Sequence, residues 1–216
     1  MKRITFYFDV ISPYAWLAFD RLPHAVEGCS VVVNYQPVLL AGLLSHWGQK
    51  GPAEIEPKRA WTYRQVAWLA QQQGTPLQLP QPHPFNPLVL QRLALATAPA
   101  GGTPNRYAVN RLFRHVWCRT DANPNEPAAL AALSQALAPC RDPAGAAVKA
   151  ELRAGTEAAA AAGIFGVPTL VFDGRAFFGH DALPMLRAAL LGDAWFDGPA
   201  WAEAGQQAPG VQRKAG

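Results

Sequence analysis

The sequence lacks the cysteine and histidine patterns of several large classes of protein. Its 216 residues include only three cysteines, Cys29, Cys118 and Cys140, and no two of them form a Cys-x-x-Cys pair. A disulfide framework and a cysteine zinc site are therefore excluded. The five histidines also lack the spacing of metal ligands. We expect three free thiols and no bound metal.

Long hydrophobic runs are also missing. The apolar stretches are short or alanine-rich and are interrupted by glycine, proline or charge, well below the ~20 residues of a membrane span. Met1-Lys2-Arg3 leads directly into Ile4 without the apolar core of a secretion signal. We therefore expect a cytoplasmic protein with no membrane partner.

The chain has little excess of one charge. Its 19 basic and 15 acidic residues give a formal net charge of +4. The basic residues form no clustered stripe of the kind that nucleic-acid binding requires. We expect no nucleic-acid partner, and an acidic small molecule suits the sign of the charge better.

The residues that are present indicate a substantial core, since half of them are hydrophobic. Residues 2–9 and 31–38 are rich in aromatic and β-branched side chains, which predicts two strands. Between them, Ser12 and Pro13 offer an N-cap and a first helical residue for a helix that runs to about Val26. Residues 1–40 therefore predict a β-α-β unit.

The middle of the chain, residues 41–163, has no β-branched run and is dominated by alanine, leucine, glutamine and arginine. This composition predicts an all-helical insertion. We expect helices at about 58–73, 87–98, 103–118, 127–137 and 143–162. The proline-rich link 79–87 must be extended, because a proline disfavours helix at the residue before it. This link could form a rigid wall of a pocket or serve only as a connector.

Strand patterns return after residue 163. Residues 169–172 and 176–178 flank an Asp173-Gly174 turn, and a helix is expected at 183–191. The complete order predicts an α/β fold of the thioredoxin-like type with a large all-helical insertion. The thioredoxin-like domain would comprise residues 1–40 and 164–194, and the insertion residues 41–163. Residues 195–216 form a tail with few anchoring side chains, which we expect to be mobile in part.

Two motifs resemble those of a known family. They are Phe8-Asp9-Val10-Ile11-Ser12-Pro13-Tyr14-Ala15-Trp16-Leu17-Ala18 and Phe165-Gly166-Val167-Pro168-Thr169. Both are similar to the 2-hydroxychromene-2-carboxylate isomerases, DsbA-like proteins of the kappa-class glutathione transferase group. The similarity continues through Lys58-Arg59 and His83-Pro84-Phe85-Asn86-Pro87 and leaves out only the tail. It implies glutathione as cofactor, an aromatic acid as substrate and a homodimer.

Ser12 stands where redox relatives carry a cysteine. A helix N-terminus offers free N–H groups and the positive end of the helix dipole, which stabilise a thiolate. The sequence Ser12-Pro13-Tyr14-Ala15 contains neither sulfur of a redox pair, so it cannot carry out disulfide exchange. It can instead hold the thiolate of a bound thiol through the serine hydroxyl. Alone, Ser12 would be an ordinary cap; together with the Val167-Pro168 motif it is our predicted catalytic and cofactor-binding residue.

The resemblance implies further contacts to glutathione. Val167-Pro168 would form a cis peptide facing the helix N-terminus and leave the Val167 backbone free to pair with the cysteinyl part. Gly179, His180 and Asp181 would bind the γ-glutamyl end, with the Asp181 carboxylate receiving the ammonium group. The alternatives are a strand-edge proline without a ligand and an acidic residue that only caps a helix.

Lys58 and Asn86 match polar positions of the family, where the resemblance implies contacts to glutathione or to a substrate carboxylate. The pair Lys58-Arg59 is also typical of a solvated helix start, and Arg59 is not predicted to bind. Asn86 could equally cap the helix expected after it.

The predicted substrate site is completed by Pro13, Tyr14 and Glu54. Glu54 departs from the family, in which an asparagine near this position touches the substrate. A glutamate there would repel a carboxylate, and so the exact substrate is left open.

We predict glutathione-dependent isomerisation of 2-hydroxychromene-2-carboxylate-type aromatic acids, with the glutathione thiolate as a recycled nucleophile. One alternative is a kappa-like glutathione transferase or peroxidase that consumes glutathione at the same site. The other is a non-catalytic thioredoxin-like binding protein, in which Ser12 only caps the helix.

Overall fold

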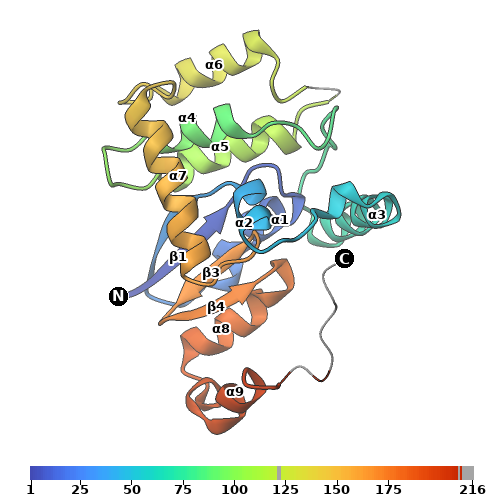
Figure 1. Ribbon diagram of the computed structural model, residues 1–216, viewed down its shortest axis with the longest axis vertical. Helices are drawn as coiled ribbons and strands as arrows, with labels where there is room; N and C mark the ends of the chain where they lie inside the picture. The colour runs from blue at the N-terminus through green and yellow to red at the C-terminus, as the bar shows by residue number, and fades with distance from the viewer. Residues whose placement is uncertain (121–122, 209, 211–216) are drawn as a thin grey trace.

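The computed structural model describes residues 1–120, 123–208 and 210 (Figure 1). Four strands in this part of the chain form one mixed sheet in the order β2-β1-β3-β4. They are β1 (Lys2–Phe8), β2 (Val31–Pro37), β3 (Thr169–Phe172) and β4 (Arg175–Phe178). β1 pairs in parallel with β2 and antiparallel with β3, which forms a hairpin with β4. The parallel pair needs a crossover, and α1 (Pro13–Ala25) supplies it.

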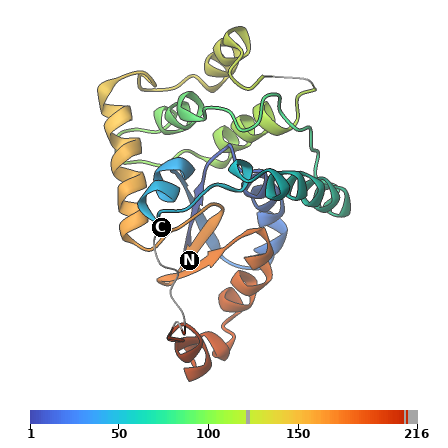
Figure 2. The same ribbon diagram turned by 45° about the vertical axis from the view of Figure 1, so that its right-hand side comes forward.

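The helical elements surround this sheet on several sides (Figures 1 and 2). In both views α7 (Ala146–Ala161) and α3 (Glu56–Gln73) lie on opposite sides of the molecule. The others between β2 and β3 are α2 (Leu40–His46), η1 (Pro52–Glu54), α4 (Leu88–Ala96), α5 (Arg106–Trp117) and α6 (Pro127–Leu137). The predicted thioredoxin-like fold with a helical insertion is confirmed.

Each expected helix of the insertion is present; α6 has the expected ends, and the other four differ at one or both ends by one to three residues. α5 begins at Arg106 rather than near residue 103, because the Asn105 side chain accepts a hydrogen bond from the Ala108 N–H (2.9 Å) and caps the helix there. α2 was not predicted. Its first N–H, of Leu40, donates to the Asp9 carboxylate (2.9 Å), a cap that lies 31 residues away in sequence.

One apolar core joins the sheet to the helical insertion. Phe6 and Phe8 of β1 are fully buried, and the ring of Phe8 lies 5.5 Å from that of Phe113 on α5. Phe19 on α1 contacts the same Phe113 ring at 5.1 Å. The buried cluster therefore crosses the boundary between the predicted thioredoxin-like domain and the predicted insertion.

The C-terminal part continues from β4 through η2 (His180–Ala182), α8 (Leu183–Leu191), η3 (Ala194–Asp197) and α9 (Pro199–Ala204). The sequence suggested few anchors after residue 195, and over residues 195–204 this was wrong. Phe196 is 5% exposed, and its ring and that of Trp201 lie 5.8 and 6.3 Å from Phe177 on β4. The end of the predicted tail, residues 211–216, lies outside the described residues. Within the described residues, no helix combines the length and apolar character needed to cross a membrane.

Gln91 on α4 forms hydrogen bonds to the backbone where β1 and β2 end. Its side chain is fully buried, and its amide nitrogen donates to the carbonyls of Phe8 (2.9 Å) and Val38 (2.7 Å). Its amide oxygen accepts from the Val10 N–H at 3.4 Å. Buried backbone groups need partners, and so this side chain fixes the path of the chain from β1 into the following turn.

We expect Gln91→Leu to lower the free energy of unfolding by about 2 to 4 kcal/mol, because it leaves the Val38 carbonyl and the Val10 N–H buried without partners. Urea unfolding at equilibrium measures this change. Gln71→Leu, at an exposed position of α3, is the matched control. Equal effects of the two substitutions would contradict the role given to Gln91.

Candidate functional site

Ser12 is the N-cap of α1 and lies in a buried position. Its hydroxyl oxygen accepts a hydrogen bond from the Ala15 N–H (3.2 Å), and its hydroxyl donates to the Val167 carbonyl at 3.3 Å. The side chain is 5% exposed, and Pro13 occupies the first helical position. The structure thus brings together the helix start and the Val-Pro motif, 155 residues apart in sequence. Ser12 is both a cap and a contact across the site.

Two backbone N–H groups at this position have no hydrogen-bond partner among the described residues: those of Tyr14 and Val167. Pro13 has no N–H to offer. The Val167–Pro168 peptide is cis, as the resemblance implied. Val167 is 7% exposed. Unpartnered N–H groups of this kind at a helix start can bind an anion or an extended peptide.

Gly179, His180 and Asp181 lie next to this motif. The Gly179 N–H donates to the Pro168 carbonyl (2.9 Å), which fixes the segment beside the cis peptide. Gly179 has φ 96°, a backbone conformation that favours glycine, and a Cβ there would also displace the Asp181 carboxylate. Burial raises the pKa of the Tyr14 hydroxyl, a side-chain hydrogen bond with Thr62 lowers it in part, and the negative charge of Asp181 raises it by a smaller amount. The exposed Asp181 carboxylate therefore lies near the Tyr14 hydroxyl, which points toward α3.

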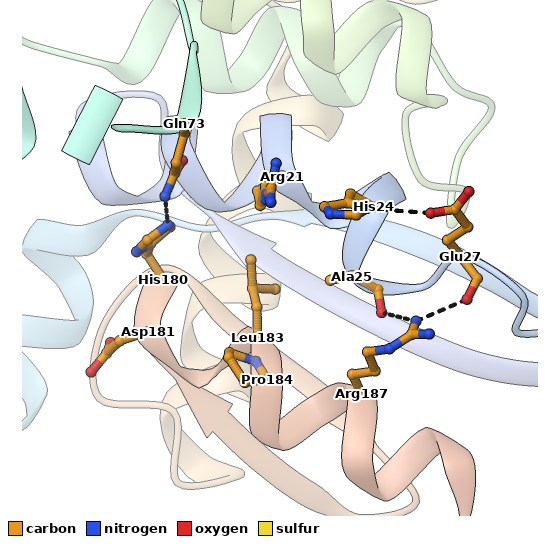
Figure 3. Close-up of a pocket in the computed structure, with 10 residues that line it drawn as sticks. All are labelled: Arg21, His24, Ala25, Glu27, Gln73, His180, Asp181, Leu183, Pro184 and Arg187. Carbon is orange, nitrogen blue, oxygen red and sulfur yellow. Dashed lines mark hydrogen bonds and ion pairs between the residues drawn. The ribbon is translucent and has the colours of Figure 1, made fainter. Parts of the chain in front are cut away.

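A cavity of about 580 Å³ extends from this segment along the second half of α1, between α1 and α8 (Figure 3). The amide of Gln73, at the end of α3, hydrogen bonds to Nε2 of His180 on one side of the cavity. Burial lowers the pKa of His180. Arg187 lies at the other end and donates to the carbonyls of Ala25 (3.0 Å) and Glu27 (2.8 Å). Ser12 does not line this cavity.

Three other predicted residues, Lys58, Glu54 and Asn86, make no hydrogen bond to Ser12 in the described part of the chain. The Glu54 carboxylate accepts a hydrogen bond from the Gly51 N–H at the start of η1. The Asn86 side chain accepts from the Leu88 N–H (3.0 Å), a local contact just before the N-cap residue of α4, Pro87. Lys58 is exposed and forms no hydrogen bond or ion pair within the described residues. Substrate roles for these three residues stay predictions.

Tyr14 connects the site to α3. Its hydroxyl donates to the Gln65 side-chain oxygen on α3 at 2.6 Å, and its ring packs beside Val66 and Ala70 of the same helix. α3 therefore forms one wall next to the start of α1.

Asp9 is a site residue that the sequence interpretation missed, because it was regarded only as the end of a strand. Its side chain is fully buried, and its two carboxylate oxygens accept from the Ile11 N–H (3.1 Å) and the Leu40 N–H (2.9 Å). Burial raises its pKa to about 7 against the effect of these hydrogen bonds. An acidic residue inside an apolar run, three positions before Ser12, was the available signal.

Comparisons with known proteins identify the family to which this fold belongs. Residues 3–191 match the DsbA-like thioredoxin domain. Glutathione S-transferase kappa 1 of Rattus norvegicus is 28% identical over 217 residues, covering 90% of this chain and 92% of that protein. A 2-hydroxychromene-2-carboxylate isomerase of Sphingobium xenophagum is 28% identical over 201 residues, covering 88% and 98%. A solved structure of 2-hydroxychromene-2-carboxylate isomerase aligns with a TM-score of 0.76 at 23% identity over 95% of this chain and 100% of the other.

The raised pKa of Asp9 can be tested through the pH dependence of protein stability. Its pKa is about 7 in the fold and ordinarily 3.8, so between these values the folded chain keeps a proton that the unfolded chain releases. The contribution of this carboxyl to the free energy of unfolding therefore falls as pH rises from about 4 to about 7. We expect the destabilisation by Asp9→Asn to shrink across this window by up to about 4 kcal/mol.

Chemical unfolding of both proteins at several pH values measures this difference. Asp193→Asn, at an exposed cap of η3, controls for the loss of a capping carboxylate. A cost of Asp9→Asn that is the same at pH 4 and pH 8 would contradict the raised pKa.

Proposed function

The chain belongs to the DsbA-like thioredoxin domain family, and from this premise we propose that it is a glutathione-dependent isomerase of 2-hydroxychromene-2-carboxylate-type aromatic acids. The observation that carries the proposal is the Ser12 hydroxyl, buried at the start of α1 and facing the Val167 carbonyl at 3.3 Å. Relatives named 2-hydroxychromene-2-carboxylate isomerase and glutathione S-transferase kappa 1, each 28% identical, support both the cofactor and the reaction.

The residues around Ser12 fit a glutathione molecule by their chemistry. The Ser12 hydroxyl can turn from the Val167 carbonyl and donate to a sulfur anion, next to the open Tyr14 N–H and the positive end of the helix dipole. Val167 then offers an N–H and a carbonyl to the cysteinyl backbone, as a neighbouring strand would. The Asp181 carboxylate suits the ammonium group of the γ-glutamyl end.

Bound glutathione would supply the nucleophile, a thiolate that adds reversibly to the unsaturated acid and leaves unchanged. The chain contributes the electrostatics: Ser12 and the N-terminus of α1 favour the charged form of the sulfur. The burial of Ser12 keeps competing water away from that hydrogen bond. Because positions 12 and 15 hold serine and alanine, no protein thiol can capture the cofactor as a disulfide there.

A kappa-like transferase or peroxidase is the second candidate, favoured by the rat and human relatives of that name. The two functions differ in what happens to glutathione. An isomerase leaves the glutathione concentration constant over many turnovers, whereas a transferase or peroxidase consumes one or two molecules per turnover. Assays with a chromene carboxylate, a conjugation acceptor and a hydroperoxide separate them, and no acceleration of any of these reactions would favour the non-catalytic binding protein. The homodimer and the cytoplasmic location stay predictions.

We expect Ser12→Ala to raise the pKa of the bound glutathione thiol by about 1 to 2 units, because a charge-assisted hydrogen bond contributes about 1.5 to 3 kcal/mol. The ultraviolet absorbance of the thiolate, titrated with pH in the complex, measures this pKa. Ser45→Ala, at an exposed position of α2, should leave it unchanged. Calorimetry that detects no glutathione binding to the wild-type protein would exclude the proposed function.

We expect Asp181→Asn to weaken glutathione binding by about 10-fold, since it removes the charge that pairs with the ammonium group. The pKa of the bound thiol should stay the same, because Asp181 does not contact the sulfur position. Calorimetric titration gives the affinity. Asp173→Asn in the β3–β4 turn, an exposed aspartate paired with Arg175 at 3.2 Å, is the control, and equal losses from both substitutions would contradict the assignment.

A further inference from the structure

The proline-rich link between α3 and α4 carries a half-buried histidine, His83, that directly contacts the turn before Ser12. Nε2 of His83 lies 2.8 Å from the carbonyl oxygen of Ile11. Nδ1 of the same ring lies 2.8 Å from the Tyr63 hydroxyl on α3. The ring packs 5.3 Å from that of Trp117 on α5. The link is therefore more than a connector, and none of these contacts takes part in the cofactor binding described above.

The two hydrogen bonds determine which nitrogen of the imidazole carries the proton. The Ile11 carbonyl can only accept, so Nε2 of His83 carries the proton. Burial lowers the pKa of His83, which leaves Nδ1 as an acceptor for the Tyr63 hydroxyl. The Tyr63 hydroxyl also lies 3.1 Å from the carbonyl of His83 itself, so its one proton is shared between these two acceptors, the nearer of which is Nδ1. Burial raises the pKa of the Tyr63 hydroxyl, and the positive charge of the nearby Arg59 lowers it in part.

The contact fixes the peptide group that carries Ser12. The Ile11 carbonyl and the Ser12 N–H belong to one peptide plane. His83 binds the carbonyl at 2.8 Å, and the Asp9 carbonyl binds the Ser12 N–H at 3.0 Å. Held at both ends, this plane sets the direction in which the Ser12 side chain leaves the backbone.

We propose that His83 is a positioning residue for the Ser12 hydroxyl, and that Tyr63 acts through it by holding the imidazole with Nε2–H toward Ile11. This inference rests on the proposed function, since it concerns the hydrogen bond from Ser12 to the glutathione sulfur. Precise placement of that donor matters because the strength of a hydrogen bond falls steeply with distance and angle.

The test uses three variants of the full chain. His83→Leu removes the donor to Ile11, His83→Gln keeps an amide N–H where Nε2–H stood, and Tyr63→Phe removes the group that orients the ring. The pKa of the bound glutathione thiol is measured by thiolate absorbance, and affinity for the thiol form is measured at pH 6. Tyr107→Phe, at a tyrosine of α5 that is 61% exposed, is the control.

We expect His83→Leu to raise the thiol pKa by about 1 unit, with affinity at pH 6 changed less than about 3-fold. His83→Gln should restore most of the wild-type pKa, and Tyr63→Phe should give a smaller rise than His83→Leu. If His83→Leu does not fold, the positioning role is tested by the other two variants: the thiol pKa should rise in Tyr63→Phe and stay near the wild-type value in His83→Gln.

A thiol pKa that stays at the wild-type value in His83→Leu or in Tyr63→Phe, or that rises equally in His83→Gln and His83→Leu, would overturn the positioning role while leaving the proposed function standing. A wild-type protein that does not bind glutathione would overturn the proposed function first, and this inference with it.

Discussion

The turn between β1 and α1 lies in the interior of the protein. The backbone groups of this turn cannot reach water and must find hydrogen-bond partners within the protein. The helical insertion supplies them. Gln91 on α4 binds the Phe8 carbonyl and the Val10 N–H, and the Trp117 indole on α5 donates to the Val10 carbonyl at 2.9 Å. His83 binds the next carbonyl along the turn. The rest of the structure depends on this set of buried hydrogen bonds, because it joins the sheet, the insertion and the site.

This constraint explains why a serine can serve at this position. The pKa of a cysteine sulfur can be lowered by the helix N-terminus alone, but a serine acts only through a hydrogen bond with defined geometry. Here the Ser12 peptide is held by Asp9 and His83, and its hydroxyl already lies between the Ala15 N–H and the Val167 carbonyl. The Ser12 side chain is thus placed before a ligand arrives, and only its hydroxyl hydrogen must turn from the Val167 carbonyl to the ligand.

Local sequence signals were sufficient wherever the interaction itself was local. The aromatic and β-branched run of β1, the Ser12-Pro13 helix start and the Asp173-Gly174 turn all gave the correct elements. The resemblance placed Val167-Pro168 correctly opposite Ser12 and in the cis form. The fold could therefore be predicted almost completely.

The failures concern partners that lie far apart in sequence. α2 was missed because its cap is Asp9, and the anchoring of residues 195–204 was missed because Trp201 and Phe196 pack on Phe177 of a different element. Asp9 and His83 were not assigned to the site for the same reason, since neither residue reveals its hydrogen-bond partner through spacing. By contrast, the Asn86 side chain makes a local contact with the Leu88 N–H at the start of α4.

A crystal structure of the protein with bound glutathione tests the central claim most directly. We expect the glutathione sulfur to lie within hydrogen-bond distance of the Ser12 hydroxyl, with the cysteinyl backbone paired to Val167. A glutathione molecule whose sulfur points to solvent while the Ser12 hydroxyl still donates to the Val167 carbonyl would contradict it.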